Sequence, residues 1–208
     1  MTTVYLIRHG ELEYPRNNRG QRLLYGPDVP LSDKGRRQIQ ELSQRIVREA
    51  SKLEKIYTSP FSRAVETAEI LTSRLQLSQP VRMPEFQDIN PGSMVGKLLD
   101  DVIQGRLQEY GETHEEVSER MMRGLKRVLY QDTGRSVGIV SHGDSIRVLL
   151  FRLVHQTETL PPIDELIKTD YLDKGEAWRL LVDDQMHLVE KIYLGRPPEL
   201  WGKGERKS

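Results

Sequence analysis

The sequence predicts an α/β fold, a three-layer sandwich in which helices flank a mainly parallel central sheet. Short apolar runs, typical of strands buried on both faces, alternate along the chain with segments whose apolar residues recur at helical spacing. The chain also has no internal repeat, no low-complexity tract and no linker rich enough to divide it. This alternation favours a single layered domain over residues 1–208.

The first half of the chain predicts two strand–helix units. Residues 3–8 form the first strand, because TVYLIR is β-branched, aromatic and aliphatic. A helix follows with Ser32 as its N-cap, and its apolar face runs from Ile39 to Ala50. A second strand is predicted at residues 55–58. The next helix opens at Ser59-Pro60, since proline is favoured in a first helical turn.

The second half begins with an irregular stretch. In residues 81–113 the apolar side chains recur at neither helix nor strand spacing. We predict a loop or cap region there, because long irregular segments in compact domains are usually functional. Beyond it the pattern predicts further helices and strands, and a tail at 201–208 that frays. These elements are a helix at 117–129, a strand at 136–141, a helix at 146–154, and strands at 178–183 and 187–194.

Composition excludes several classes of protein. The 31 basic and 31 acidic side chains cancel, whereas a nucleic-acid-binding surface usually shows a basic excess. The absence of cysteine removes disulfides, thiolate zinc sites and cysteine nucleophiles, and it fits a reducing compartment. No apolar run reaches 18 residues, and the first ten residues lack the order of a signal peptide. We therefore expect a soluble, cytoplasmic protein that binds neither nucleic acid nor membranes.

Three polar segments follow predicted strands. They are residues 8–11 (RHGE), Ser59-Pro60 with Arg63 just beyond, and residues 141–144 (SHGD). Because the carboxyl ends of parallel strands meet at one edge of a sheet, we expect the three segments to share a pocket. Arginine matches phosphate oxygens bidentately, and a neutral imidazole can attack phosphorus. The chemistry predicted is phosphoryl transfer, with a carboxylic acid nearby to protonate the leaving group.

The same residues resemble a known family. Leu6-Ile7-Arg8-His9-Gly10-Glu11 is similar to the signature of the histidine phosphatase superfamily, the phosphoglycerate mutase-like enzymes. The resemblance covers most of residues 4–155 in the family's order and spacing. It continues through 29–35 (VPLSDKG), Thr58-Ser59-Pro60 with Arg63-Ala64 and Thr67-Ala68, Asp88-Ile89 with Gly92 and Gly96, and 140–143 (VSHG).

The resemblance implies a role for each matching residue. His9 is the nucleophile that becomes phosphohistidine, and the phosphoryl group is bound by three side chains, Arg8, Arg63 and His142. Residues 86–92 (FQDINPG) fit the frame of the family's general acid, with Asp88 in the place of the usual glutamate. Glu85 lies out of frame and is the alternative acid. Asp88 also has a purely local interpretation, as a turn residue before Asn90-Pro91-Gly92.

Substrate contacts are predicted where the resemblance is weakest, in residues 12–28 and 89–113. Candidate substrate-binding residues are Asn17 and Arg19 in the first of these loops, and Gly143 beside the second histidine. The loop arginines have a competing interpretation as solvated surface charges. The remaining histidines show no metal-ligand spacing, so we predict that the protein needs neither a metal nor another cofactor.

The function predicted is that of a phosphomonoesterase that hydrolyses a small phosphorylated metabolite through a phosphohistidine. The segment between Gly96 and Glu112 is short for the substrate-covering insertion of the mutases, which favours a phosphatase. Two alternatives stay open: a phosphoglycerate mutase, and a phosphoprotein-binding module with reduced catalysis. The presence of both histidines and both arginines argues against the second alternative. The resemblance is also compatible with a homodimer.

Overall fold

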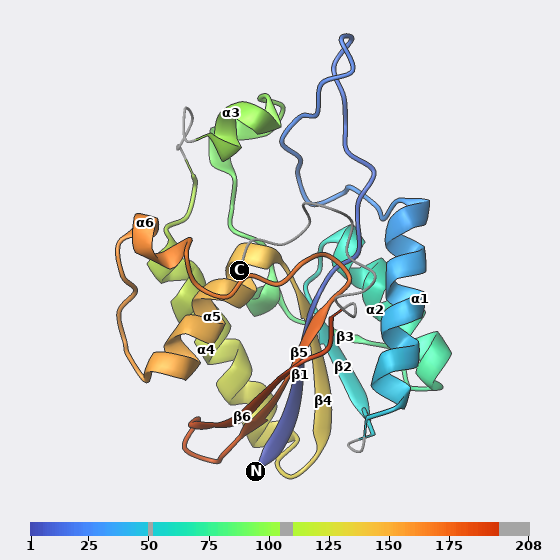
Figure 1. Ribbon diagram of the computed structural model, residues 1–208, viewed down its shortest axis with the longest axis vertical. Helices are drawn as coiled ribbons and strands as arrows, with labels where there is room; N and C mark the ends of the chain where they lie inside the picture. Colours follow the sequence, from blue (N-terminus) through green and yellow to red (C-terminus); the bar gives the residue numbers. More distant parts are fainter. Residues whose placement is uncertain (50–51, 105–109, 196–208) are drawn as a thin grey trace.

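The computed structural model describes residues 1–49, 52–104 and 110–195, and its centre is one β-sheet (Figure 1). The strand order is β3-β2-β4-β1-β5-β6. The strands are β1 (Thr2–Arg8), β2 (Lys55–Thr58), β3 (Val81–Arg82), β4 (Ser136–Ser141), β5 (Ala177–Val182) and β6 (Leu188–Tyr193). The first four run parallel to one another, whereas β5 is antiparallel to both β1 and β6. The predicted α/β fold with a mainly parallel sheet is confirmed.

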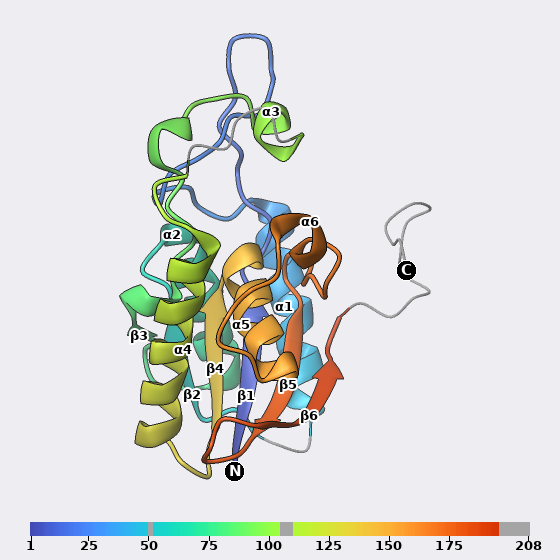
Figure 2. The ribbon, with the colours of Figure 1, turned by 90° about the vertical axis from the view of Figure 1, so that its left-hand side faces the viewer.

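Helices cover both faces of the sheet (Figure 2). On one face lie α1 (Asp33–Val47) and α2 (Ser62–Leu75), and on the other lie α4 (His114–Gln131) and α5 (Gly143–His155). Strand β1 serves both layers. Its alternate side chains Val4 and Leu6 join the core under α4 and α5, while Tyr5 and Ile7 join the core under α1 and α2. This two-sided burial explains why the strand is almost wholly apolar.

The helices begin where capping residues place them. The Ser32 hydroxyl accepts the Gly35 N–H at the start of α1, as the sequence predicts. Helix α4 starts three residues before the predicted Val117, because Thr113 and Glu116 form a capping box. Helix α5 likewise starts at Gly143, directly after β4, rather than at Ile146.

The region predicted as irregular, residues 81–113, holds short elements in its described part. They are β3, two 3₁₀ turns at Pro84–Phe86 and Gly92–Met94, and helix α3 (Leu99–Ile103). A further short helix that the sequence did not predict is α6 (Ile163–Leu166). The predicted end of the first helix at Ala50 and the predicted frayed tail lie outside the described residues.

Two segments stand over the carboxyl edge of the sheet. Residues 12–31 form a hairpin-like arm that projects away from the sheet, and α3 lies beside it (Figures 1 and 2). Isolated bridges join Leu12 to Leu31 and Arg16 to Arg22 within the arm, and Leu23 to Leu98 across the two segments. Within the described part of the chain, no helix is long and apolar enough to cross a membrane.

Candidate active site

The two histidines of the sequence motifs lie side by side at the carboxyl ends of β1 and β4. Arg8 is in register with Ser141, so the next residues, His9 and His142, occupy matching places on neighbouring strands. Their ring centroids are 5.1 Å apart, and both side chains are buried. The backbone after His9 packs closely against the first turn of α1, where a Cβ at Gly10 would lie 2.6 Å from the Gly35 carbonyl oxygen. Glycine at position 10 permits this close approach of the two backbones.

Backbone contact fixes the tautomer of His9. Its Nδ1 lies 2.7 Å from the Gly10 carbonyl oxygen, which can only accept, so Nδ1 carries the proton and donates it. The lone pair is then on Nε2. Burial, together with the nearby His142, Arg63 and Arg8, holds the pKa of His9 well below its ordinary value. The ring is consequently neutral and nucleophilic at neutral pH.

His142 is held between a hydroxyl and a carboxylate. Its Nε2 is 2.8 Å from the Ser59 hydroxyl oxygen, and its Nδ1 is 3.4 Å from Asp88 Oδ2. Burial lowers the pKa of His142, and the charges of Arg63, Arg8 and Arg120 lower it further. The ring is therefore neutral in the free protein, with a carboxylate close to one of its nitrogens.

Two guanidinium groups complete the centre, those of the buried Arg63 and the partly buried Arg8. Arg63 donates to Asp88 Oδ2 at 2.8 Å and to the Gly26 carbonyl at 3.2 Å, while Arg8 donates to the Leu172 carbonyl at 2.7 Å. The buried Nε atoms of both arginines lack a hydrogen-bond partner among the described residues. Buried donors without partners are costly, and a phosphate oxygen is a suitable acceptor for them.

Of the two candidate acids, the structure brings Asp88 to His142. Its carboxylate lies between Arg63 and His142, and Oδ1 accepts the Ile89 N–H at 3.1 Å. Glu85 is directed elsewhere: its Oε1 accepts from Arg127 of α4 at 2.9 Å. The difference follows from the turn at Pro84–Phe86, which places Glu85 against α4 before the chain reaches the sheet edge.

The predicted substrate-binding residues separate into two groups. Gly143 lies in the centre, because a Cβ there would come within 2.8 Å of Arg8 Cζ. Asn17 and Arg19 belong to the exposed tip of the arm, where Asn17 Oδ1 accepts the backbone N–H groups of Arg19 and Gln21. The Asn17 side chain thus closes its own turn, and the structure does not bring Asn17 or Arg19 to the histidines. A substrate contact of Asn17 or Arg19 at the tip of the arm stays a prediction.

Several residues of the centre were not found from the sequence. The Tyr25 ring lies 4.9 Å from the Arg63 guanidinium, and the Tyr171 ring lies 4.6 Å from that of Arg8. Burial raises the pKa of Tyr171 to about 12, so its hydroxyl stays protonated. Arg120, described below, was missed as well. These residues lie in irregular segments or on a helix, and no local pattern connects them to the motifs.

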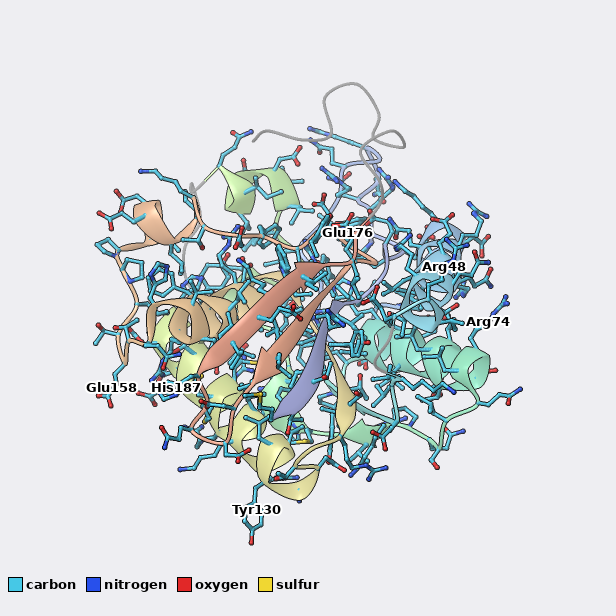
Figure 3. All side chains as sticks on the ribbon, turned by 60° about the horizontal axis from the view of Figure 1, so that its bottom comes forward. Arg48, Arg74, Tyr130, Glu158, Glu176 and His187 are labelled. Carbon is cyan, nitrogen blue, oxygen red and sulfur yellow. The ribbon has the colours of Figure 1, made fainter. Side chains whose placement is uncertain are left out.

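The described residues hold no group of three or more histidine, aspartate or glutamate side chains arranged for a metal ion. His187, for example, lies at the turn that joins β5 and β6, where it pairs with Asp183 (Figure 3). The side chains that meet in the centre offer imidazole, guanidinium and carboxyl groups.

Comparison with known proteins shows which family the chain belongs to. A model of the histidine phosphatase superfamily, branch 1, matches residues 4–163. The chain belongs to the histidine phosphatase superfamily. Its relatives include an uncharacterized phosphatase, PhoE, of Bacillus subtilis, which is 36% identical over 72% of this chain and 76% of its own length. Another is a probable phosphoglycerate mutase, GpmB, of Cronobacter sakazakii, 30% identical over 72% of this chain and 74% of its own.

A solved structure has the same architecture. Bacillus stearothermophilus YhfR superposes with a TM-score of 0.73 at 28% identity, over 90% of this chain and 94% of that protein. The family predicted from the motifs and its α/β fold are therefore confirmed. Family membership together with the phosphatase relatives identifies this histidine phosphatase as an enzyme.

Proposed function

We propose that the protein is a phosphomonoesterase that hydrolyses a small phosphorylated metabolite through a phosphohistidine at His9. The observation that carries the proposal is the state of the His9 ring: buried, neutral and with Nδ1 committed to the Gly10 carbonyl, so that the lone pair is on Nε2. The buried Arg63, the partly buried Arg8 and a second imidazole lie near it. Such a group is prepared to attack phosphorus and poorly suited to any role that needs a charged imidazole.

In the first step, the substrate's phosphate binds to Arg8, Arg63 and His142. His9 Nε2 then attacks phosphorus, and a P–N bond forms as the P–O bond to the leaving group breaks. The guanidinium groups stabilise the negative charge on the equatorial oxygens. An alkoxide leaves poorly unless it is protonated, and Asp88 supplies the proton.

The carboxylate of Asp88 is placed for this transfer. In the free protein its Oδ2 accepts from Arg63 at 2.8 Å, and a substrate phosphate that binds Arg63 brings its leaving-group oxygen beside the same carboxylate. In the second step, the ionised Asp88 takes a proton from water, which attacks phosphorus. The P–N bond breaks, and its electron pair returns to His9 Nε2.

Replacing His9 by Ala tests the nucleophile. We expect turnover of p-nitrophenyl phosphate to disappear, because no other described group offers a lone pair at that place. The unaltered enzyme, quenched with base during turnover, should carry one phosphoryl group on His9 by mass spectrometry. Retained turnover in the His9→Ala variant would reject the mechanism.

Replacing Asp88 by Asn tests the acid, with Glu85→Gln as the matched control. Asp88→Asn should slow alkyl phosphates by about 100-fold or more and p-nitrophenyl phosphate far less, because a good leaving group needs little protonation. Glu85→Gln should change neither rate, since Glu85 pairs with Arg127 on α4. An equal loss on both substrates in Asp88→Asn would remove the acid role.

A phosphoglycerate mutase is the alternative that the GpmB relative favours. A mutase returns the phosphoryl group to a second hydroxyl of the substrate and depends on a bisphosphorylated primer. Release of inorganic phosphate from 3-phosphoglycerate without a primer identifies the phosphatase. Isomerisation that needs a primer identifies the mutase. Action in the cytoplasm and assembly as a homodimer stay predictions, and light scattering of the purified protein measures the assembly.

A further inference from the structure

Arg120 of α4 is a buried arginine whose donors are fully used. Its Nε and Nη2 donate to the two carboxylate oxygens of Glu112, at 2.6 and 2.9 Å. Nη1 donates to the carbonyls of Glu85 and Gln87, at 2.9 and 2.7 Å, and Nη2 also donates to the carbonyl of Asp88 at 2.9 Å. A guanidinium has five N–H donors, and each has an acceptor here. The side chain is only 9% exposed.

These bonds belong to a larger set that holds the segment carrying Asp88. The carbonyl of Phe86 accepts from the Ser141 hydroxyl at 2.7 Å, and that of Gln87 accepts also from the Ser145 hydroxyl at 3.0 Å. Four successive carbonyls, those of residues 85–88, are thus bound by side chains from α4, β4 and α5. Residues 87–90 lie in neither helix nor strand, so side chains must fix their backbone.

Stability alone is a weak explanation for a buried arginine at this place. Removing a guanidinium and a carboxylate from water is costly, and well-packed apolar residues often replace such pairs without loss of stability. What apolar residues cannot do is fix the position of carbonyl groups. Glu112 extends the arrangement, because its Oε2 also accepts the N–H of Asn90, on the far side of Asp88. Backbone is therefore held on both sides of the acid.

We propose that Arg120, anchored by Glu112, is a positioning residue that sets the place of Asp88 opposite the leaving-group oxygen. Arg120 does not touch the substrate. It acts through the carbonyls of residues 85, 87 and 88. The Asp88 carboxylate can meanwhile give up its bond to Arg63 and bind the substrate. The inference rests on the proposed role of Asp88 as the general acid.

Arg120 also acts through its charge, and the experiment must distinguish this effect from the positioning of Asp88. It contributes to the lowered pKa of His142, so a neutral substitution alters phosphate binding as well as the position of Asp88. Arg120→Lys keeps the charge and removes the planar fork, whereas Arg120→Met removes both. Arg127→Met is the matched control. Arg127 lies two turns further along α4, is half-exposed, and binds the Glu85 side chain rather than backbone carbonyls.

The measurement is kcat/KM for glycerol 2-phosphate, an alkyl ester, relative to kcat/KM for p-nitrophenyl phosphate. We expect this alkyl-to-aryl ratio to fall by about 10- to 100-fold in both Arg120→Lys and Arg120→Met, because a displacement near 1 Å has effects of that size. Arg127→Met should leave the ratio unchanged. In Arg120→Lys combined with Asp88→Asn, the ratio should be no lower than in Asp88→Asn alone, since a misplaced acid and an absent one fail at the same step.

Thermal melts establish that each variant is folded. If both Arg120 variants unfold, Glu112→Gln decides, because it disturbs the anchor and keeps every carbonyl contact. A lowered ratio in that variant supports the proposal, and an unchanged ratio overturns it. A fall in Arg120→Met alone assigns the effect to charge and overturns the positioning role. An unchanged ratio in Asp88→Asn instead rejects the acid itself, and the proposal for Arg120 with it.

Discussion

Substitution of Gly143 by alanine should disturb the binding of the substrate's phosphate and leave proton transfer from Asp88 unaffected. A Cβ at this position would lie 2.8 Å from Arg8 Cζ and 2.7 Å from Tyr171 Cζ. Carbon atoms in contact settle near 3.5 Å, so the guanidinium and the ring must each move by about 0.7 to 0.8 Å. Arg8 is also bound to the Leu172 carbonyl, and that bond is strained or lost on movement.

A displacement of this size at Arg8, which we propose to bind the phosphate, is expected to lower kcat/KM by about 100-fold, which corresponds to about 2.7 kcal/mol. Alkyl and aryl phosphates should lose equally, since both bind through the same phosphate. Competitive inhibition by vanadate should weaken in parallel. Gly138→Ala in β4 is the control, because its Cβ meets only core side chains, the nearest atom being Ile56 Cγ1 at 3.3 Å. A folded Gly143→Ala enzyme with unchanged kcat/KM would refute this account of the centre.

Three further predictions concern stability and binding. His9 and His142 stay neutral when buried, while unfolded histidines take up protons below about pH 6.5, so the free energy of unfolding should fall with decreasing pH from that value. The slope should approach about 1.4 kcal/mol per pH unit for each histidine, and urea titrations of His142→Gln should show a smaller slope; equal slopes would contradict the assignment. Asp132→Ala should lower the free energy of unfolding by about 3 kcal/mol, because a buried carboxylate bound to lysine and tyrosine is lost, with kcat/KM unchanged. Tyr171→Ala should weaken vanadate inhibition by about two- to ten-fold through loss of the ring beside Arg8, whereas Tyr171→Phe keeps that contact; equal effects would assign it to the hydroxyl.

Much of the fold follows from local pattern. The middle residues of β1 and β4, at 4–7 and 137–140, are buried on both faces and are apolar or glycine, so they stand out in the sequence. Strand β2 shows the same pattern only at Ile56 and Tyr57. Helix starts were placed three residues late at α4 and α5, because a helix begins at its cap rather than at its first apolar residue. Helix α3 has five residues and α6 has four, too few for a period to show.

Some residues of the candidate site could be predicted from the sequence, and others could not. His9, His142 and Arg63 were predicted to meet because each follows a strand or begins the next helix, and topology then brings strand ends together. Tyr171 and Arg120 reach the centre only through tertiary contacts, which leave no trace in neighbouring residues. The direction in which the arm points is likewise a tertiary property, so the sequence could not show that Asn17 lies at its exposed tip, away from the histidines.

The central position of β1 determines when this enzyme becomes active during its synthesis. The strand that leads to His9 is made before β4 and β5, yet it lies between them in the sheet (Figure 1). The Gly134 N–H binds the Thr2 hydroxyl oxygen across 132 residues, and the Leu172 carbonyl holds Arg8 across 164. A nascent chain that ends before these segments has the histidine but no pocket around it. We therefore expect the pocket around His9 to form only once the second half of the chain can pack against β1, which is synthesised earlier.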